Sequence, residues 1–425
     1  MAQRNAFPFE YELHDLSNGL RLVTVPLPWR GTASVYIVVH AGSRNEVEPG
    51  RSGFAHFFEH MMFRGTPAWP PERYERELQR LGASSNAYTE DDRTVYHTTL
   101  AAADLDTLLA MEADRFLHLR YSEEDFRTEA LAVLGEYWKD SAEPLNRLHE
   151  VLRDTAFDVH PYKHTTMGFL RDIERMPEMY DYSLSFFDRF YRPENTTLLI
   201  TGDIEPPRVR SLVEQHWGAW RRGTYTPDIP QEPAQTAPRE ARIEWETHTL
   251  PYVVAAQRAP AYDDTSLECA ALDLISAMSF SEGSDLYRRL VIEEQWADEL
   301  WANQVDHLDP YLFTAVARVK QPDRTADVRR AIENELDRLA AEPPAEERLE
   351  QVRTHLFYRF QLGLNRSDAV AAHLAPFLAL RRTPETVNRL FGTYASVTPR
   401  DLAAAAARWF RREGRTVVTL EEKAR

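Results

Sequence analysis

A proline-rich stretch near the middle of the chain constrains its fold more than any other feature. Between residues 221 and 242, polar residues alternate with Pro227, Pro230, Pro233 and Pro238. Such a composition packs poorly and favours an extended linker. The chain of 425 residues also exceeds what one hydrophobic core usually serves. We therefore expect an N-terminal domain over residues 1–222, a linker over 223–242 and a C-terminal domain over 243–425.

The order of predicted elements is similar on the two sides of this linker. The first half alternates β-branched strands with amphipathic helices and closes with a strand over residues 196–201. The second half restarts with a strand over 252–257 and a helix over 267–280. An amphipathic helix over 286–294, two strands and long helices to the end follow. Residue identity between the halves is too faint to count as a repeat. The order predicts an α+β fold of two similar domains, each a mostly antiparallel sheet packed with helices.

Composition excludes several classes of function. The net charge of −17 argues against nucleic acid or an anionic membrane as partner. No run of about 18 apolar residues occurs, so no membrane span is expected. Cys269 is the sole cysteine, which rules out an internal disulfide and a cysteine-rich zinc site. The start of the chain lacks the apolar core of a secretory signal. We expect a cytoplasmic enzyme, or a periplasmic one if a signal peptide has been removed.

The five residues from His56 to His60 carry the clearest chemical signal in the chain. His56, Glu59 and His60 form an H-x-x-E-H pattern, and residues three and four apart share one face of a helix. Neutral imidazole is a common zinc ligand, and a free carboxylate beside a zinc-bound water is a suitable general base. The pattern is typical of inverzincins and predicts hydrolysis of peptide bonds. The alternative is a helix with two incidental histidines.

A third protein ligand is needed, because two imidazoles and a water leave a tetrahedral zinc site one ligand short. Glu129 and Glu136 lie two turns apart on the same face of a predicted helix over residues 123–138. Acidic residues on a helix usually mark a solvated face. Here two carboxylates share a face within a largely apolar segment, which weakens that interpretation.

With these motifs the chain resembles the pitrilysin family, which includes insulin-degrading enzyme and the mitochondrial processing peptidases. It is most similar to the short two-domain, processing-peptidase-like members. The resemblance covers the whole chain, with specific motifs in the first half and mainly element order in the second. Further motifs follow the family's order, namely Gly53-Phe54-Ala55, Arg64-Gly65-Thr66, Asn86-Ala87-Tyr88-Thr89, His160-Pro161-Tyr162 and Gly202-Asp203.

The resemblance implies a role for each residue of the site. His56, His60 and Glu136 would bind one zinc ion per chain, with water in the fourth position. Glu59 would take a proton from that water as general base and pass it to the departing amine. Glu129 would act behind the ligands, by orienting one of them or adjusting the charge of the site.

A neighbouring segment is expected to bind the substrate. Asn86, Ala87, Tyr88 and Thr89 resemble the family's edge strand, to which a peptide adds as an extra strand. The alternative for this segment is an ordinary edge strand. The acidic turn that follows, residues 90–92, could favour a basic substrate, although an acidic turn is more often merely solvated.

The second half departs from the family at one place. Active members carry an arginine and a tyrosine, seven residues apart, that bind the substrate backbone and help to stabilise the oxyanion. Val291 and Asp298 align with these positions here, and neither side chain can do this. Either the alignment is wrong, or this chain is the metal-bearing subunit of a heterodimer whose partner supplies the pair. The heterodimer is preferred, and a homodimer is the second choice.

We therefore expect a zinc endopeptidase that forms half of a clamshell and hydrolyses peptides or unfolded segments. The alternative from another class is a non-catalytic structural or assembly subunit, like the respiratory-complex core proteins of the family. The intact set of His56, Glu59, His60 and Glu136 argues against this alternative, because a retired site has no reason to keep all four.

Overall fold

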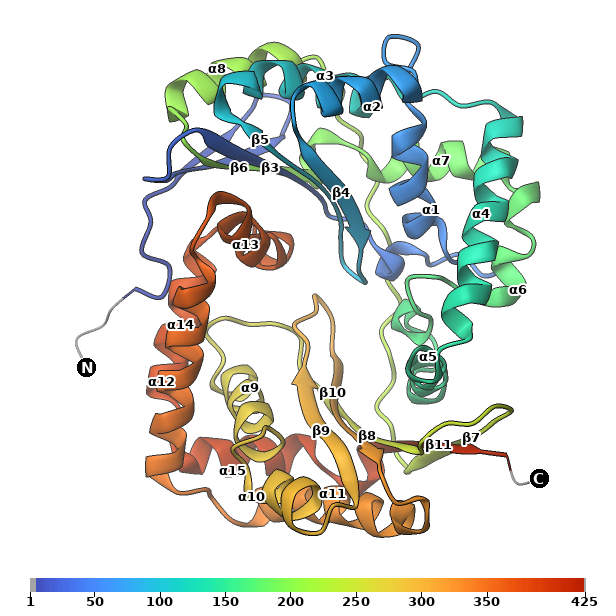
Figure 1. Cartoon of the computed structure of the whole chain (residues 1–425), viewed down its shortest axis with the longest axis vertical. Helices are drawn as coiled ribbons and strands as arrows, with labels where there is room; N and C mark the ends of the chain where they lie inside the picture. Colours follow the sequence, from blue (N-terminus) through green and yellow to red (C-terminus); the bar gives the residue numbers. More distant parts are fainter. Residues whose placement is uncertain (1–4, 424–425) are drawn as a thin grey trace.

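The computed structural model describes residues 5–423 and contains one mixed sheet in each half of the chain (Figure 1). The six-stranded sheet has the order β1-β2-β6-β3-β5-β4, and the five-stranded sheet has the order β7-β11-β8-β10-β9. The strands of the first sheet are β1 (Glu12–Asp15), β2 (Arg21–Pro26), β3 (Thr32–Val39), β4 (Ser84–Thr89), β5 (Thr94–Ala101) and β6 (Thr196–Gly202). Those of the second are β7 (Arg239–Trp245), β8 (Tyr252–Ala259), β9 (Ala297–Gln304), β10 (Tyr311–Val319) and β11 (Arg415–Glu422).

Helices cover both sheets. Those of the first half are α1 (Phe54–Met61), α2 (Pro71–Arg80), α3 (Leu105–His118), α4 (Glu123–Ser141), α5 (Pro144–Ala156), α6 (Leu170–Ile173), α7 (Tyr180–Phe190) and α8 (Pro206–Trp217). Those of the second half are α9 (Leu267–Ser279), α10 (Asp285–Tyr287), α11 (Thr325–Ala341), α12 (Glu346–Gly363), α13 (Ser367–Arg381), α14 (Glu385–Ser396) and α15 (Pro399–Trp409). Within residues 5–423, every helix is too short or too polar to cross a lipid bilayer.

The two sheets share one topology. β2 runs parallel to β6, and β7 runs parallel to β11, whereas the other neighbouring strands in both sheets are antiparallel. The series β2-β6-β3-β5-β4 therefore matches β7-β11-β8-β10-β9 strand for strand, and β1 is an addition to the first sheet. The predicted α+β fold of two similar, mostly antiparallel domains is confirmed.

One face of each sheet is covered by helices of its own half, and the opposite face is covered by a helix from the other half of the chain. On β3, Ile37 packs into the core under the first-half helices, while Tyr36 faces a core that contains residues of α13. On β8, Val253 packs under the second-half helices, while Val254 faces residues of α5. Figure 1 shows α13 against the first sheet and α5 beside the second. These strands are apolar on both faces because both faces are buried.

Three elements differ from the sequence expectations. Strand β7 begins at Arg239, so the last residues of the predicted linker pair with β11, and residues 218–238 carry no helix or strand. The last element among residues 5–423 is strand β11, so the expectation of helices to the end is wrong. The helix expected over 286–294 consists of α10 followed by a π-helical segment, Arg288–Glu293. The domain limits themselves stay a prediction.

A buried polar network joins the turn between β4 and β5 to the second half of the chain. Asp91 accepts hydrogen bonds from the Ser43 hydroxyl at 2.7 Å and from Arg153 Nη2 at 2.6 Å. Its other oxygen lies 2.8 Å from Nε2 of His307, which belongs to the loop between β9 and β10. Burial alone would raise the pKa of Asp91, but the charges of Arg153 and His307 outweigh it and lower the pKa.

The neighbouring carboxylate in the same turn is also buried. Asp92 accepts hydrogen bonds from the Tyr162 hydroxyl at 2.7 Å and from the Leu308 backbone N–H at 2.9 Å. The expectation of a solvated or substrate-binding acidic turn is therefore wrong for Asp91 and Asp92. A run of acidic residues in sequence does not reveal partners that come from distant loops.

Candidate metal centre

Helix α1 is held at its N-terminus by a buried carboxylate. Gly53 adopts a positive φ of 92° immediately before the helix. Glu46 accepts hydrogen bonds from the backbone N–H groups of Gly53 and Ala55, both at 2.7 Å. These N–H groups have no partner inside the helix, so Glu46 fixes the start of α1. Sequence reasoning missed Glu46, because a lone glutamate in a polar loop carries no signal for this role.

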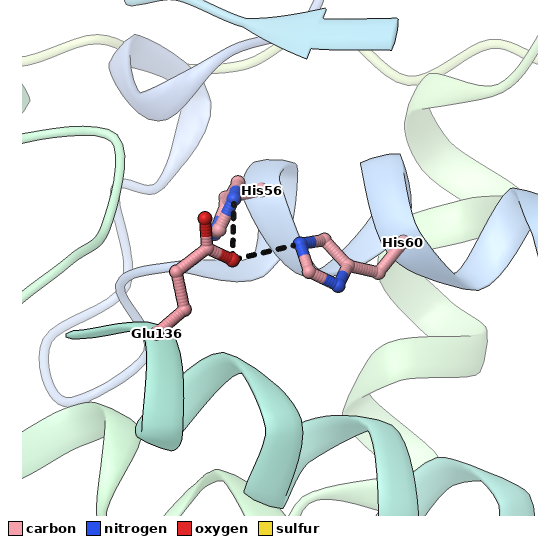
Figure 2. Close-up of side chains that lie close together, drawn as sticks. All are labelled: His56, His60 and Glu136. Atoms are coloured by element: carbon pink, nitrogen blue, oxygen red, sulfur yellow. Dashed lines mark ion pairs between the residues drawn. The ribbon is translucent and has the colours of Figure 1, made fainter. Parts of the chain in front are cut away.

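Three candidate ligands come together where α1 and α4 face each other. Figure 2 shows Glu136 on α4 pointing at His56 and His60 on α1. One ligand atom of each residue lies within 4.8 Å of the others. Glu136 Oε2 is 3.8 Å from His56 Nε2 and 3.2 Å from His60 Nε2. A tetrahedral zinc ion with bonds of about 2.1 Å separates neighbouring ligand atoms by about 3.4 Å. The spacing fits one zinc ion.

His56 is a buried imidazole without a hydrogen bond to any of residues 5–423. Its side chain is 9% exposed, and its Nδ1 atom is fully enclosed. Burial, and then the neighbouring His60, lower the pKa of His56 to about 3. The ring is therefore neutral near pH 7, which is the form that binds metals. Its Nε2 atom faces Glu136, so this neutral imidazole suits a metal ligand.

Glu129 lies behind His60 on the same helix as Glu136. Its Oε1 is 3.0 Å from His60 Nδ1, and its Oε2 accepts a hydrogen bond from Arg64. The hydrogen bond between His60 and Glu129 raises the pKa of His60, and burial opposes this rise. Burial raises the pKa of Glu129, but the hydrogen bonds from His60 and Arg64 outweigh it, so that the pKa falls. Glu129 thus holds the ring of His60 from the side opposite Glu136.

Glu59 contacts the last residue of β4. The Thr89 hydroxyl donates a hydrogen bond to Glu59 Oε2 at 2.7 Å. Burial raises the pKa of Glu59, and the Thr89 hydrogen bond opposes this rise. A half-buried carboxylate held by a hydroxyl is suited to accept and return a proton.

Strand β4 ends the first sheet and pairs only with β5 within the described part of the chain. The turn after it is closed by a hydrogen bond from Glu90 N–H to the Arg93 carbonyl at 2.8 Å. In an antiparallel pair, the backbone N–H groups of one strand point alternately toward the partner strand and away from it. The N–H of Ala87 therefore points to the free edge of the sheet. That N–H donates to the side-chain oxygen of Asn86 at 2.9 Å. Tyr88 packs on the α13 side of the sheet. No other described strand pairs with this edge, and the Asn86 side chain occupies one of its donors.

Comparison with known proteins gives the class of the chain. Residues 21–169 match the family model described as "Insulinase (Peptidase family M16)", and residues 180–356 match "Peptidase M16 inactive domain". The chain is 28% identical over 377 residues to the zinc protease PqqE of Helicobacter pylori, which covers 87% of this chain and 83% of that protein. A solved protease of Helicobacter pylori matches with a TM-score of 0.91 and 26% identity, over 97% of this chain and 99% of that one.

These matches describe a two-domain protein of the zinc metalloprotease class. The chain belongs to peptidase family M16, the pitrilysin and insulinase family. The family predicted from the sequence motifs is confirmed, as is the two-domain fold.

One solved structure relates the chain to a longer protein. The periplasmic protease PqqL of Escherichia coli matches with a TM-score of 0.79 and 19% identity. The match covers 98% of this chain but 48% of that one. At this identity the likeness concerns the fold alone. The first half of PqqL has been solved separately, and this chain covers 91% of it.

Proposed function

We propose that this chain is a zinc-dependent endopeptidase. The observation that carries the proposal is the convergence of His56, His60 and Glu136 from two helices, with Glu59 beside them and the open edge of β4 next to Glu59. Two imidazoles and one carboxylate with a free fourth position are the donor set of a catalytic zinc site. Bound there, zinc would lower the pKa of a water toward about 7 and polarise the scissile carbonyl.

Residues of the chain would carry out proton transfer and substrate binding. Glu59 takes a proton from the attacking water and gives it to the leaving amine. The Thr89 hydroxyl holds the Glu59 carboxylate in place, and that carboxylate would carry the proton. Strand β4 binds the substrate backbone as an added strand along α1. This mode of recognition needs no chain terminus, so it suits cleavage within a peptide or an unfolded segment.

We propose further that the chain is the catalytic half of a two-subunit clamshell. Val291 packs against the core of the second half, and Asp298 makes a two-point ion pair with Arg318 at 2.9 Å for each contact. Neither position offers a donor to an oxyanion. The PqqL match supports a two-unit assembly, because that longer chain contains one segment that matches this chain and a remainder of similar length. A related subunit would supply the arginine and tyrosine, and a homodimer is the second choice.

The proposed assembly predicts weak activity for the isolated chain. Loss of an oxyanion donor costs about 10²–10³ in rate, so the purified chain should bind zinc yet cleave an unstructured peptide at least about 100-fold more slowly than the assembled enzyme. The measurement is kcat/KM before and after addition of a related chain that lacks H-x-x-E-H and carries the arginine and tyrosine. Full activity of the chain alone, as a monomer, would contradict the split assembly.

A further inference from the structure

Glu129 is a deeply buried carboxylate whose two oxygens have different partners. Its side chain is 6% exposed. Oε1 pairs with His60 Nδ1, while Oε2 accepts a hydrogen bond from Arg64 Nε and forms an ion pair with Arg64 Nη2. Arg64 is 44% exposed and reaches into the site from the surface. A buried carboxylate needs a compensating cation or several donors, and Arg64 is the permanent cation here.

Arg64 reaches Glu129 because the chain continues past α1 for one further turn. The 3₁₀ segment Met62–Arg64 follows α1 directly, so Arg64 lies four residues after His60 on the same face. Gly65 then leaves the helix with a φ of 79°. A Cβ atom at Gly65 would lie 2.3 Å from the Trp69 carbonyl oxygen, so only glycine permits this exit. This turn places the side chains of His60 and Arg64, which are neighbours on one helix face, against Glu129.

We propose that Arg64 is a positioning residue of the metal centre, an inference that rests on the proposed zinc site. By fixing Oε2, Arg64 holds Glu129 where Oε1 meets His60 Nδ1. That contact in turn sets the orientation of the His60 ring, so that Nε2 points toward His56 and Glu136. Partners that orient metal-binding histidines typically contribute about 10–100-fold to metal affinity. Here that partner is Glu129, and Arg64 acts on His60 through Glu129.

The test is the zinc dissociation constant of Arg64→Met and Arg64→Lys, measured by competition with a chromophoric chelator. Arg64→Met should weaken zinc binding about tenfold, at the lower end of the range for residues behind a ligand. Arg64→Lys should lie in between, because an ammonium group lacks the planar fork of arginine. Arg127→Met is the matched control, since Arg127 lies on α4 in an exposed pair with Glu123, and its zinc affinity should stay unchanged.

A second measurement separates this inference from the proposed function. In metal-free protein labelled with ¹⁵N-histidine, the Nδ1–H signal of His60 should lose its hydrogen-bonded shift in Arg64→Met and keep it in Arg127→Met. An Arg64→Met protein with unchanged zinc affinity and an unchanged His60 signal would overturn the role of Arg64. A wild-type protein that binds no zinc, yet shows the His60 change in Arg64→Met, would overturn the proposed function alone. Arg64→Lys keeps the test valid if Arg64→Met fails to fold.

Discussion

Glu59→Gln should retain zinc and lose nearly all peptidase activity. Glutamine keeps the size of the side chain, and the Thr89 hydroxyl can still donate to its amide oxygen, as it does to Glu59 Oε2. The amide cannot accept a proton from water, however. General acid–base catalysis contributes about 10²–10⁴-fold, so kcat of the assembled enzyme should fall by about that factor. Metal analysis should still find one zinc ion per chain.

The matched control for this variant is Glu124→Gln, because Glu124 is an exposed acid in the first turn of α4. Its activity should equal that of the unmodified enzyme. Undiminished activity in Glu59→Gln would remove Glu59 from the mechanism. Loss of zinc in Glu59→Gln would point to a ligand role in place of a proton carrier.

Asp91→Asn should be the most destabilising single change outside the hydrophobic cores. Asp91 is the common acceptor for Arg153 and for His307 of the second half. Removing its charge leaves the buried Arg153 without its carboxylate partner and weakens the contact with His307. Breaking a buried ion pair in this way costs about 3–5 kcal/mol. Chemical denaturation should show this loss, and Asp154→Asn, which breaks the surface pair with Lys163, should cost less than about 1 kcal/mol. Equal effects of the two changes would contradict a buried network that joins the halves.

The same network predicts a dependence on pH. Burial lowers the pKa of His307, but the hydrogen bond and charge of Asp91 outweigh it and raise the pKa above the ordinary value of 6.5. A group with a raised folded-state pKa stabilises fully below its unfolded value and loses that contribution as the pH rises through the folded value. The difference in unfolding free energy between the wild type and His307→Gln should therefore be largest below about pH 6.5 and shrink at higher pH. A difference that grows with pH would contradict this pairing.

The sequence signal for the candidate metal centre is local. His56, Glu59 and His60 lie within one helix, and Glu129 and Glu136 share a face of another, so helical spacing alone sets most of the geometry. The structure adds that the two helices face each other at these positions. It also adds Glu46 and Arg64, whose roles depend on where the chain turns before and after α1.

The sequence did not predict β7 and β11, the two strands at one margin of the second sheet. Strand β7 is an edge strand in which Glu240, Arg242 and Glu244 are exposed, and such charged alternation resembles a linker. Strand β11 follows long helices, and it becomes a strand by pairing with both β7 and β8. The buried turn at Asp91 depends on a loop more than 200 residues away in sequence. These features arise from tertiary contacts that no local pattern encodes.

The most direct test of the metal centre is anomalous diffraction at the zinc absorption edge from crystals of the protein prepared with zinc. A zinc site formed by these residues predicts one strong peak per chain, about 2.1 Å from a nitrogen of His56, a nitrogen of His60 and a carboxylate oxygen of Glu136. A crystal with no peak between these three side chains, or with Glu136 turned away from both histidines, would contradict it.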